Sequence, residues 1–149
     1  MEKVRFSALR RRLWQVAPYE RFAAWKECHA LAIRIYRVTV GFPKHELYGL
    51  TSQVRRAAFS AAVNIVEGSS RRGRIEFRRF LDISLGSLSE VGYILRFARE
   101  LELLSSSEWK ELDDHQQRAR YLTWKLYDAV ARPKKAITAF DRLRPPSTA

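Results

Sequence analysis

Five arginines fall within the stretch EGSSRRGRIEFRRF, residues 67–80, which joins two segments with a helical pattern. The five are Arg71, Arg72, Arg74, Arg78 and Arg79. A guanidinium group presents a planar fork of donors that matches a phosphate, so such a cluster can bind a nucleic-acid backbone. Backbone N–H groups at the start of a helix attract anions as well. The alternative is a solvated turn that is basic and binds nothing.

A second polar set precedes this turn at helical spacing: Gln53, Arg56, Ser60, Asn64 and Glu67. Steps of three and four residues place all five on one face of a helix. If the two helices form a hairpin, Arg56 comes within reach of Glu90, and Glu67 lies beside Arg71 or Arg74. Charges near a bundle core are costly unless they are paired. We therefore predict structural ion pairs at both places.

Neither set has the composition of a catalytic site. The polar stripe contains no histidine and no nucleophile with an adjacent base. Di-iron bundles place Glu three residues before His, whereas the residues three before His29, His45 and His115 are Lys26, Phe42 and Leu112. The sequence also lacks a P-loop. We expect a protein that is not an enzyme and holds neither a metal nor a cofactor.

Apolar residues recur at alternating steps of three and four along four segments, which predicts four helices. We expect them at residues 19–40, 47–67 and 74–104, and from the serines at 105–107 to just before Pro133. Gly68 is expected to end the second helix. With no convincing strand pattern and only short connections, the expected fold is all-α: an antiparallel, up-down-up-down four-helix bundle.

The third helical segment is apolar over an unusually wide arc. Beside its main seam runs a second stripe, formed by Phe80, Ile83, Ile94, Phe97 and Leu101. A helix with two apolar stripes must contact more than one neighbour.

Positive charge is concentrated at the two ends of the chain and in the arginine turn. The net charge is +12, and residues 1–18 and 131–149 each carry five Lys or Arg against one acidic residue. We divide the chain into a basic arm or short helix (1–18), the bundle (19–131) and a basic tail (132–149). Clustered charge favours a polyanionic partner, although simple solubility is the alternative. Five residues of these basic ends are further candidate phosphate contacts: Arg10, Arg11, Arg12, Lys134 and Lys135.

The arm at residues 1–18 has two interpretations. Phe6, Leu9, Leu13 and Val16 would share one side of a basic amphipathic helix. The alternative is a disordered arm.

Three features of the sequence predict the cellular compartment of the protein. No apolar run approaches the roughly 20 residues that a membrane span needs. The arginines at positions 10–12 interrupt the N-terminal segment, so it has no signal-peptide core. The single cysteine, Cys28, forms no intrachain disulfide. Together these features predict a cytoplasmic protein with no membrane partner.

Residues 42–90 carry a run of motifs at fixed spacing. They are FP-x-x-E-x-Y-x-L-x-x-Q-x-R-R-A at 42–57, N-I-x-E-G at 64–68, Arg72, F-x-x-F-L at 77–81 and G-S-x-x-E at 86–90. This pattern resembles the four helix bundle proteins, also called 23S rRNA intervening-sequence proteins, over about residues 19–130. The resemblance implies an up-down-up-down bundle that assembles as a homopentamer and has no enzymatic activity.

A related group, the accessory variability determinant proteins of diversity-generating retroelements, looks like the same bundle. Those proteins form basic pentamers that bind nucleic acid and a reverse transcriptase. Our leading expectation is a non-enzymatic, oligomeric protein that binds the RNA or DNA backbone. The alternative is a pentameric adaptor, for example an accessory subunit of a reverse transcriptase. Because no aromatic residues interleave with the basic run as on an RNA-recognition surface, we expect weak sequence preference.

Overall fold

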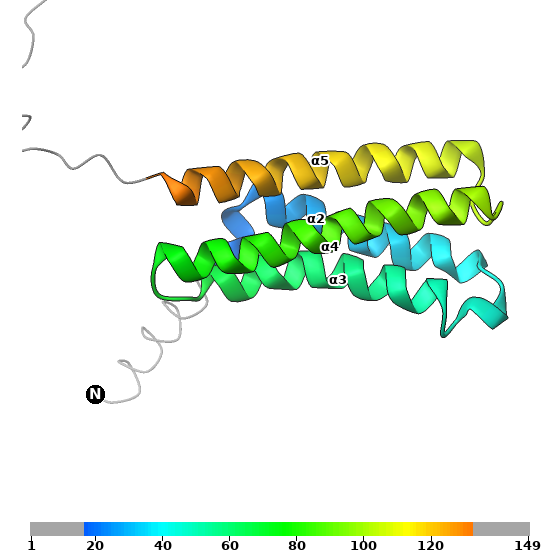
Figure 1. Ribbon diagram of the computed structural model, residues 1–149, viewed down its shortest axis with the longest axis horizontal. Helices are drawn as coiled ribbons and strands as arrows, with labels where there is room; N and C mark the ends of the chain where they lie inside the picture. The colour runs from blue at the N-terminus through cyan, green and yellow to red at the C-terminus, as the bar shows by residue number, and fades with distance from the viewer. Residues whose placement is uncertain (1–16, 133–149) are drawn as a thin grey trace, which may run out of the picture.

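The computed structural model describes residues 17–132, and every regular element in this part of the chain is a helix. Its four long helices lie side by side along one axis (Figure 1). They are α2 (Ala23–Val38), α3 (Leu50–Ser69), α4 (Arg74–Glu100) and α5 (Ser106–Ala131), with 3-10 turns η1 (Pro18–Arg21), η2 (Thr39–Gly41) and η3 (Lys44–Glu46). The prediction of an all-α fold with four helices is confirmed over this range. The predictions for Arg10, Arg11, Arg12, Lys134 and Lys135 lie outside the described residues.

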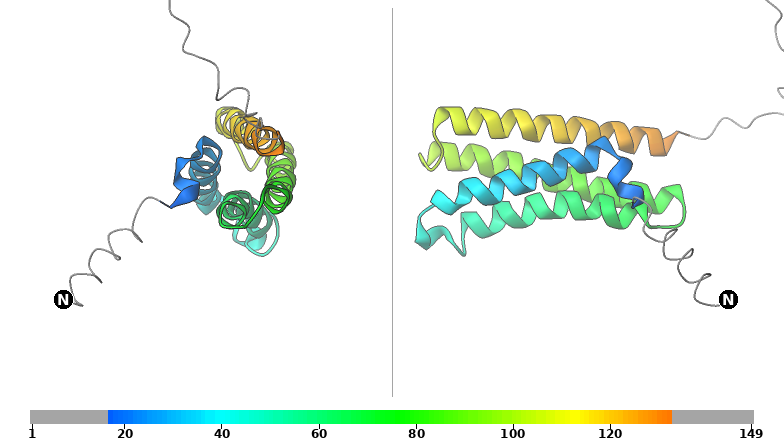
Figure 2. Two further views of the ribbon diagram at one scale, coloured as in Figure 1. Left: turned by 90° about the vertical axis from the view of Figure 1, so that its left-hand side faces the viewer. Right: turned by 180° about the vertical axis from the view of Figure 1, so that it is seen from behind.

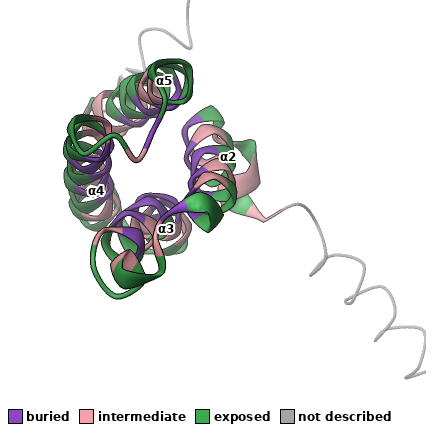
Figure 3. Cartoon of the chain, turned by 90° about the vertical axis from the view of Figure 1, so that its right-hand side faces the viewer, coloured by how far each residue is buried: buried purple, intermediate pink, exposed green. Residues whose placement is uncertain are grey.

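Each helix packs on two neighbours around a single core. α2 contacts α3 and α5, and α4 contacts the same two helices (Figure 2). Seen from the end, buried positions face the centre of the ring of helices and exposed positions face outward (Figure 3). All four helices supply the largest fully buried side chains, which include Leu31, Ile35, Ile65, Leu81, Leu88 and Leu112.

The alternating steps of three and four identified the core seams of α2 and α4. On α4 the seam residues Leu81, Ser84, Leu88 and Val91 are fully buried. On α2, Cys28 is fully buried with its Sγ 3.6 Å from Thr123 Oγ1 of α5. Burial disfavours the thiolate and raises the pKa of Cys28 to about 11, so this thiol is a packing group.

The first predicted helix is interrupted near its start. Residues 19–40 were expected to be continuous, but Phe22 is extended (φ −83°, ψ 121°) between η1 and α2. Its ring packs against Phe77 of α4, with the centroids 5.7 Å apart. Tertiary packing of this side chain overrides the local helical preference.

The second helix starts later than predicted because a carboxylate caps it. Residues 47–49 stay outside α3, and Gly49 has a ψ of −116°. Glu46 Oε2 accepts a hydrogen bond from Leu50 N at 3.0 Å, which satisfies one of the free donors at the helix start. Glu46, the first acidic residue of the motif at 42–57, therefore positions α3.

The third helix ends at Glu100 rather than at residue 104. Leu103 N donates to Ala98 O and Glu102 N donates to Arg99 O, the hydrogen-bond pattern of a Schellman motif. Glu102 takes the left-handed position of that motif, with φ 58°. The position usually holds glycine, so the sequence contained no clear stop signal.

The fourth helix starts where the sequence predicted. Ser105 Oγ accepts from Glu108 N at 3.2 Å, and Glu108 Oε2 accepts from Ser105 N at 2.9 Å, forming a capping box. These hydrogen bonds favour the carboxylate and lower the pKa of Glu108.

The prediction that Gly68 ends α3 is wrong. Gly68 lies inside the helix, where its lack of a side chain allows α4 to approach. α3 continues to Ser69 and its C-cap is Ser70. A Cβ atom at Gly68 would lie 2.7 Å from Phe77 Cδ2 and 2.8 Å from Phe80 Cβ. The absence of a side chain here lets the two phenylalanines of α4 pack on the α3 backbone.

Replacing Gly68 with alanine should therefore destabilise the bundle. We expect the free energy of unfolding to fall by about 1–3 kcal/mol, because the core is overpacked. Gly86→Ala is the matched control, since a Cβ at this position of α4 meets nothing within 4 Å. The control should gain about 0.5–1 kcal/mol from helix propensity. Urea unfolding followed by circular dichroism measures both, and equal stability of the two variants would contradict the close packing at Gly68.

Candidate nucleic-acid interface

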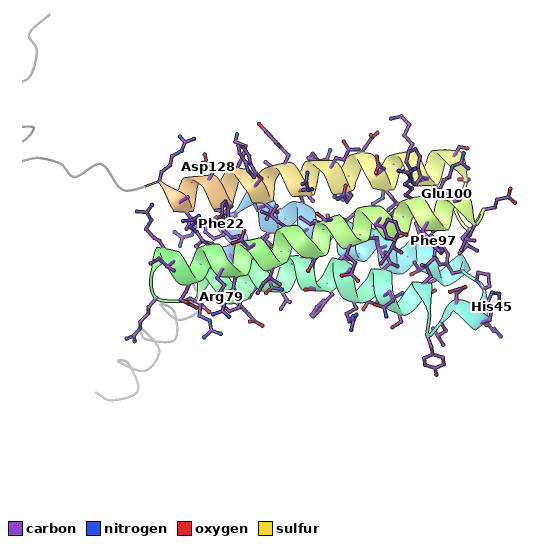
Figure 4. The ribbon with its side chains drawn as sticks, viewed as in Figure 1. Phe22, His45, Arg79, Phe97, Glu100 and Asp128 are labelled. Atoms are coloured by element: carbon purple, nitrogen blue, oxygen red, sulfur yellow. The ribbon has the colours of Figure 1, made fainter. Side chains whose placement is uncertain are left out.

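The arginine turn lies at one end of the bundle, together with the start of α2 and the end of α5. Arg74 Nε of α4 donates to Val130 O of α5 at 2.8 Å. Figure 4 places Phe22, Arg79 and Asp128 at this end, and His45, Phe97 and Glu100 towards the other. We call this surface, formed by residues 70–79 and 127–132, the arginine end.

The turn itself depends on one glycine and two serines. Gly73 has φ 97°, which side-chain-bearing residues rarely adopt, and it is the N-cap of α4. It supplies no side-chain cap, so the first N–H groups of α4 have no side-chain acceptor. Ser69 Oγ donates to Val66 O and Ser70 Oγ donates to Glu67 O, both at 2.7 Å. The serines thus satisfy two backbone carbonyl groups at the end of α3.

Three of the five arginines are held in place by the bundle. Arg71 stacks over the Phe80 ring at 5.0 Å and Arg78 over the Tyr127 ring at 4.8 Å. Arg78 Nη2 also donates to the Tyr127 hydroxyl at 2.7 Å, and Arg74 is fixed by its hydrogen bond to α5. Because these side chains are already ordered, they lose less conformational entropy on binding a ligand.

The other two arginines extend into solvent. The side chains of Arg72 and Arg79 are exposed and make no hydrogen bond to any described residue. Across the described part of the chain, none of the five arginines lies within 4.0 Å of a carboxylate. The predicted pairing of Glu67 with Arg71 or Arg74 is therefore wrong: stacking and a backbone carbonyl hold these arginines instead.

The polar stripe of α3 lies along α4, and its middle forms a hydrogen-bonded seam. Ser60 Oγ lies 2.9 Å from Ser87 Oγ of α4. Asn64 Nδ2 donates to Ser60 O at 2.8 Å, within α3. Nearby, Ser84 Oγ of α4 donates to Ala61 O at 2.7 Å. Small hydroxyl side chains thus satisfy polar groups at the contact without separating the helices.

The ends of the stripe do not form the predicted ion pair. Arg56 Nη2 donates to Gln53 Oε1 of its own helix at 2.8 Å, and Arg56 is not paired with Glu90. Both charged residues are exposed. Water solvates both groups at the surface. Neither group therefore needs an ion-pair partner, as it would in the core.

Sequence reasoning missed two buried polar residues of α5, His115 and Gln116. Gln116 Nε2 donates to Leu88 O at 2.7 Å and lies against Gly92 of α4. His115 Nε2 is 3.1 Å from Glu27 Oε2 without the alignment of a hydrogen bond, and burial lowers the pKa of His115. Both residues continue the helical spacing of Leu112, which is the signal that could have placed them in the core.

The described helices carry neither a cluster of metal ligands nor a membrane-spanning segment. Within residues 17–132, no group of three or more His, Cys, Asp or Glu side chains is arranged to hold a metal ion. Over the same range, every helix is too short or too polar to cross a membrane.

The described residues form a four-helix bundle with five arginines at one end, and none of the five is paired with a carboxylate of this range. Residues 20–124 match the family described as 23S rRNA-intervening sequence protein, and the chain belongs to this family. No match is found among curated proteins.

A solved structure shares this fold over most of the chain. It is the crystal structure of a protein with unknown function from the S23 ribosomal protein family of Bacteroides thetaiotaomicron VPI-5482. The two chains are 19% identical with a TM-score of 0.64, and the match covers 70% of this chain and 98% of the other. At this identity the comparison supports the fold alone.

A substitution at Glu90 tests whether this residue is exposed and not paired with Arg56. We expect Glu90→Ala to change the free energy of unfolding by less than about 0.5 kcal/mol. A buried pair with Arg56 would instead make the loss about 3–5 kcal/mol. The matched variant is Ser84→Ala, which removes a buried hydrogen bond to Ala61 O and should lose about 1 kcal/mol. A larger loss for Glu90→Ala than for Ser84→Ala in urea unfolding would contradict the exposed geometry.

Proposed function

We propose that the protein is a non-enzymatic, oligomeric helical bundle that binds the phosphate backbone of RNA or DNA through its arginine end. The observation that carries this proposal is the group of five arginines at one end of the bundle with no carboxylate partner among the described residues. Unpaired guanidinium groups bind phosphates and release condensed counterions. Membership of a family named for a 23S rRNA intervening sequence agrees with an RNA partner.

The ordered arginines and the arginines that extend into solvent would contribute differently to a phosphate contact. The ordered guanidinium groups of Arg71, Arg74 and Arg78 form a fixed surface, and those of Arg72 and Arg79 can follow an irregular backbone. Contacts of this kind set position and affinity but read no base. Arg71 and Arg78 each cover one face of an aromatic ring, Phe80 and Tyr127, so these faces are not free to stack on bases. The proposal therefore includes weak sequence preference.

Both basic ends of the chain join the bundle at the arginine end. Residue 17 precedes η1, which packs on α2 and α3, and residue 132 follows Val130, which contacts Arg74. The two segments that carry Arg10–Arg12 and Lys134–Lys135 are thus attached beside the turn. In the proposed complex they add phosphate contacts at the same face.

For the assembly, we propose an antiparallel, up-down-up-down bundle that forms a ring of copies, with five as the number that the family resemblance implies. Ile83 and Phe97 of α4, and Leu101 at its C-cap, remain 46%, 42% and 49% exposed, although they belong to the second apolar stripe. On α5, Tyr121 and Trp124 are also more than half exposed. Contact between unlike apolar surfaces of neighbouring copies closes into a ring when the rotation permits.

The alternative function is a protein-interaction adaptor in the cytoplasm, with a reverse transcriptase or another enzyme as its partner. It is favoured by the groove that Leu85, Tyr121 and Trp124 form between α4 and α5, which would hold a partner's side chain. Sequencing the nucleic acid that co-purifies with the protein distinguishes the two. A reproducible RNA or DNA species supports the leading proposal, and its absence with a stoichiometric protein partner supports the alternative.

The arginine end is tested by the double variant Arg72→Ala, Arg79→Ala. We expect weaker binding to random-sequence single-stranded RNA and to duplex DNA alike, because backbone contacts are lost. The slope of log affinity against log salt should fall by roughly 0.7–0.9 for each lost contact. Fluorescence anisotropy over a salt series measures both quantities.

Arg96→Ala is the control for this variant. Arg96 is an exposed arginine of α4, the helix that carries Arg79, and it pairs with Glu100 at 3.2 Å towards the opposite end. Its removal should leave affinity and salt slope unchanged. If the double variant binds as tightly as Arg96→Ala, the turn is only solvated charge and the proposal fails at this surface.

The assembly is tested by placing a charge in the exposed stripe of α4. Phe97→Glu should lower the oligomer mass measured by light scattering, because a buried unpaired carboxylate disfavours the interface. Ser89→Glu adds the same charge to α4 at an exposed serine whose only described partner is its own helix, and should leave the mass unchanged. A parent protein that is monodisperse at 17.4 kDa at micromolar concentration would rule out the assembly altogether.

A further inference from the structure

An apolar groove runs along the outer side of the bundle between α2 and α3. Its volume is about 390 Å³, and its lining includes Trp25, Ile33 and Tyr36 from α2 and Phe59, Val63 and Val66 from α3. Ile33 is 41% exposed and Phe59 is 59% exposed. Aromatic and branched side chains exposed in a continuous groove indicate that another segment covers them.

The N-terminal segment of the chain joins the bundle at one end of this groove. Tyr19 of η1 also lines the groove and packs edge-on against Trp25, with the ring centroids 4.8 Å apart. Tyr36 lies eleven residues after Trp25 on the same helix, so the groove extends over about 16 Å of α2. Residues 1–16 as a helix would measure about 24 Å, enough to cover it.

The apolar residues of this segment have the spacing of the groove. Leu9, Leu13 and Val16 follow steps of four and three residues. Phe59, Val63 and Val66 follow the same steps along the α3 side of the groove. Two helices with matching steps can interdigitate their side chains along a shared seam.

We propose that residues 4–16 form an amphipathic helix that occupies the α2/α3 groove of its own copy, with Leu9 on Phe59, Leu13 on Val63 and Val16 on Val66. The occupant belongs to the same copy because Tyr19, only three residues after residue 16, already lines the groove. The docked helix runs in the direction of α3. It directs Arg10 and Arg11 away from the groove, into solvent.

Apolar contact, rather than ion pairing, holds this helix. Arg55 and Arg56 lie beside Tyr36 and Phe59 at the far end of the groove, so the flank there is basic like the segment itself. Like charges across the rim repel, and the repulsion weakens as salt is added. Docking should therefore persist at salt concentrations that dissociate a nucleic acid, and it does not depend on the arginine end.

Engineered cysteines in the full-length chain test the docked register. Cys28 is fully buried and the pKa of its thiol is about 11, so it stays protonated at about pH 8. The variant Leu9→Cys, Phe59→Cys should form a disulfide within one chain under mild oxidation. On a denaturing, non-reducing gel it should appear as a faster monomer band that a reductant reverses.

Leu9→Cys, Ser89→Cys is the control, because Ser89 is exposed on α4, which does not border the groove. Its intrachain disulfide should form at least about tenfold more slowly. Leu13→Cys, Val63→Cys repeats the test in case the first variant fails to fold, which circular dichroism reports. Equal rates for the groove and control pairs would overturn the proposal. A cross-linked dimer band from the groove pair would also overturn it, since a second copy would then fill the groove.

Discussion

The close packing of α3 on α4 is the constraint on which the rest of the molecule depends. α3 presents Ala57, Ala61 and Gly68 to the core side, so its backbone can approach α4 without large side chains between them. At such a short separation, larger polar side chains would not fit, and serine hydroxyls satisfy the polar groups instead. The same approach sets the short turn of residues 70–73, and with it the position of the arginines.

The arginine end is assembled from three helices rather than from the turn alone. Arg71 is ordered by an aromatic ring of α4, and Arg74 and Arg78 are ordered by groups of α5. Aromatic rings and a carbonyl oxygen hold a guanidinium in place without cancelling its charge, whereas a carboxylate would neutralise it. The geometry therefore orders the cluster and preserves its positive charge, which is the combination that an anion-binding surface requires.

The sequence predicted those parts of the fold that repeat and missed those that depend on a single contact. Four helices and their buried seams followed from periodicity, because every turn of helix repeats the signal. The stop at Glu102 uses a left-handed residue that is not glycine, and Gly68 serves packing rather than termination. His115 and Gln116 were overlooked because polar residues are rarely buried, although their spacing matched the core.

The ion-pair prediction shows why exposure decides between interpretations of the same pattern. Spacing placed Arg56 and Glu90 on adjacent helices, but it could not say how far from the core they lie, and both are exposed. Both charged groups therefore lie at the surface, where water solvates them without an ion-pair partner. If copies associate through their sides in a closed ring, as we propose, rotational symmetry directs every arginine end to the same face. Each added copy then multiplies the phosphate contacts available to one strand, so modest affinity per turn becomes strong and salt-dependent binding by the ring.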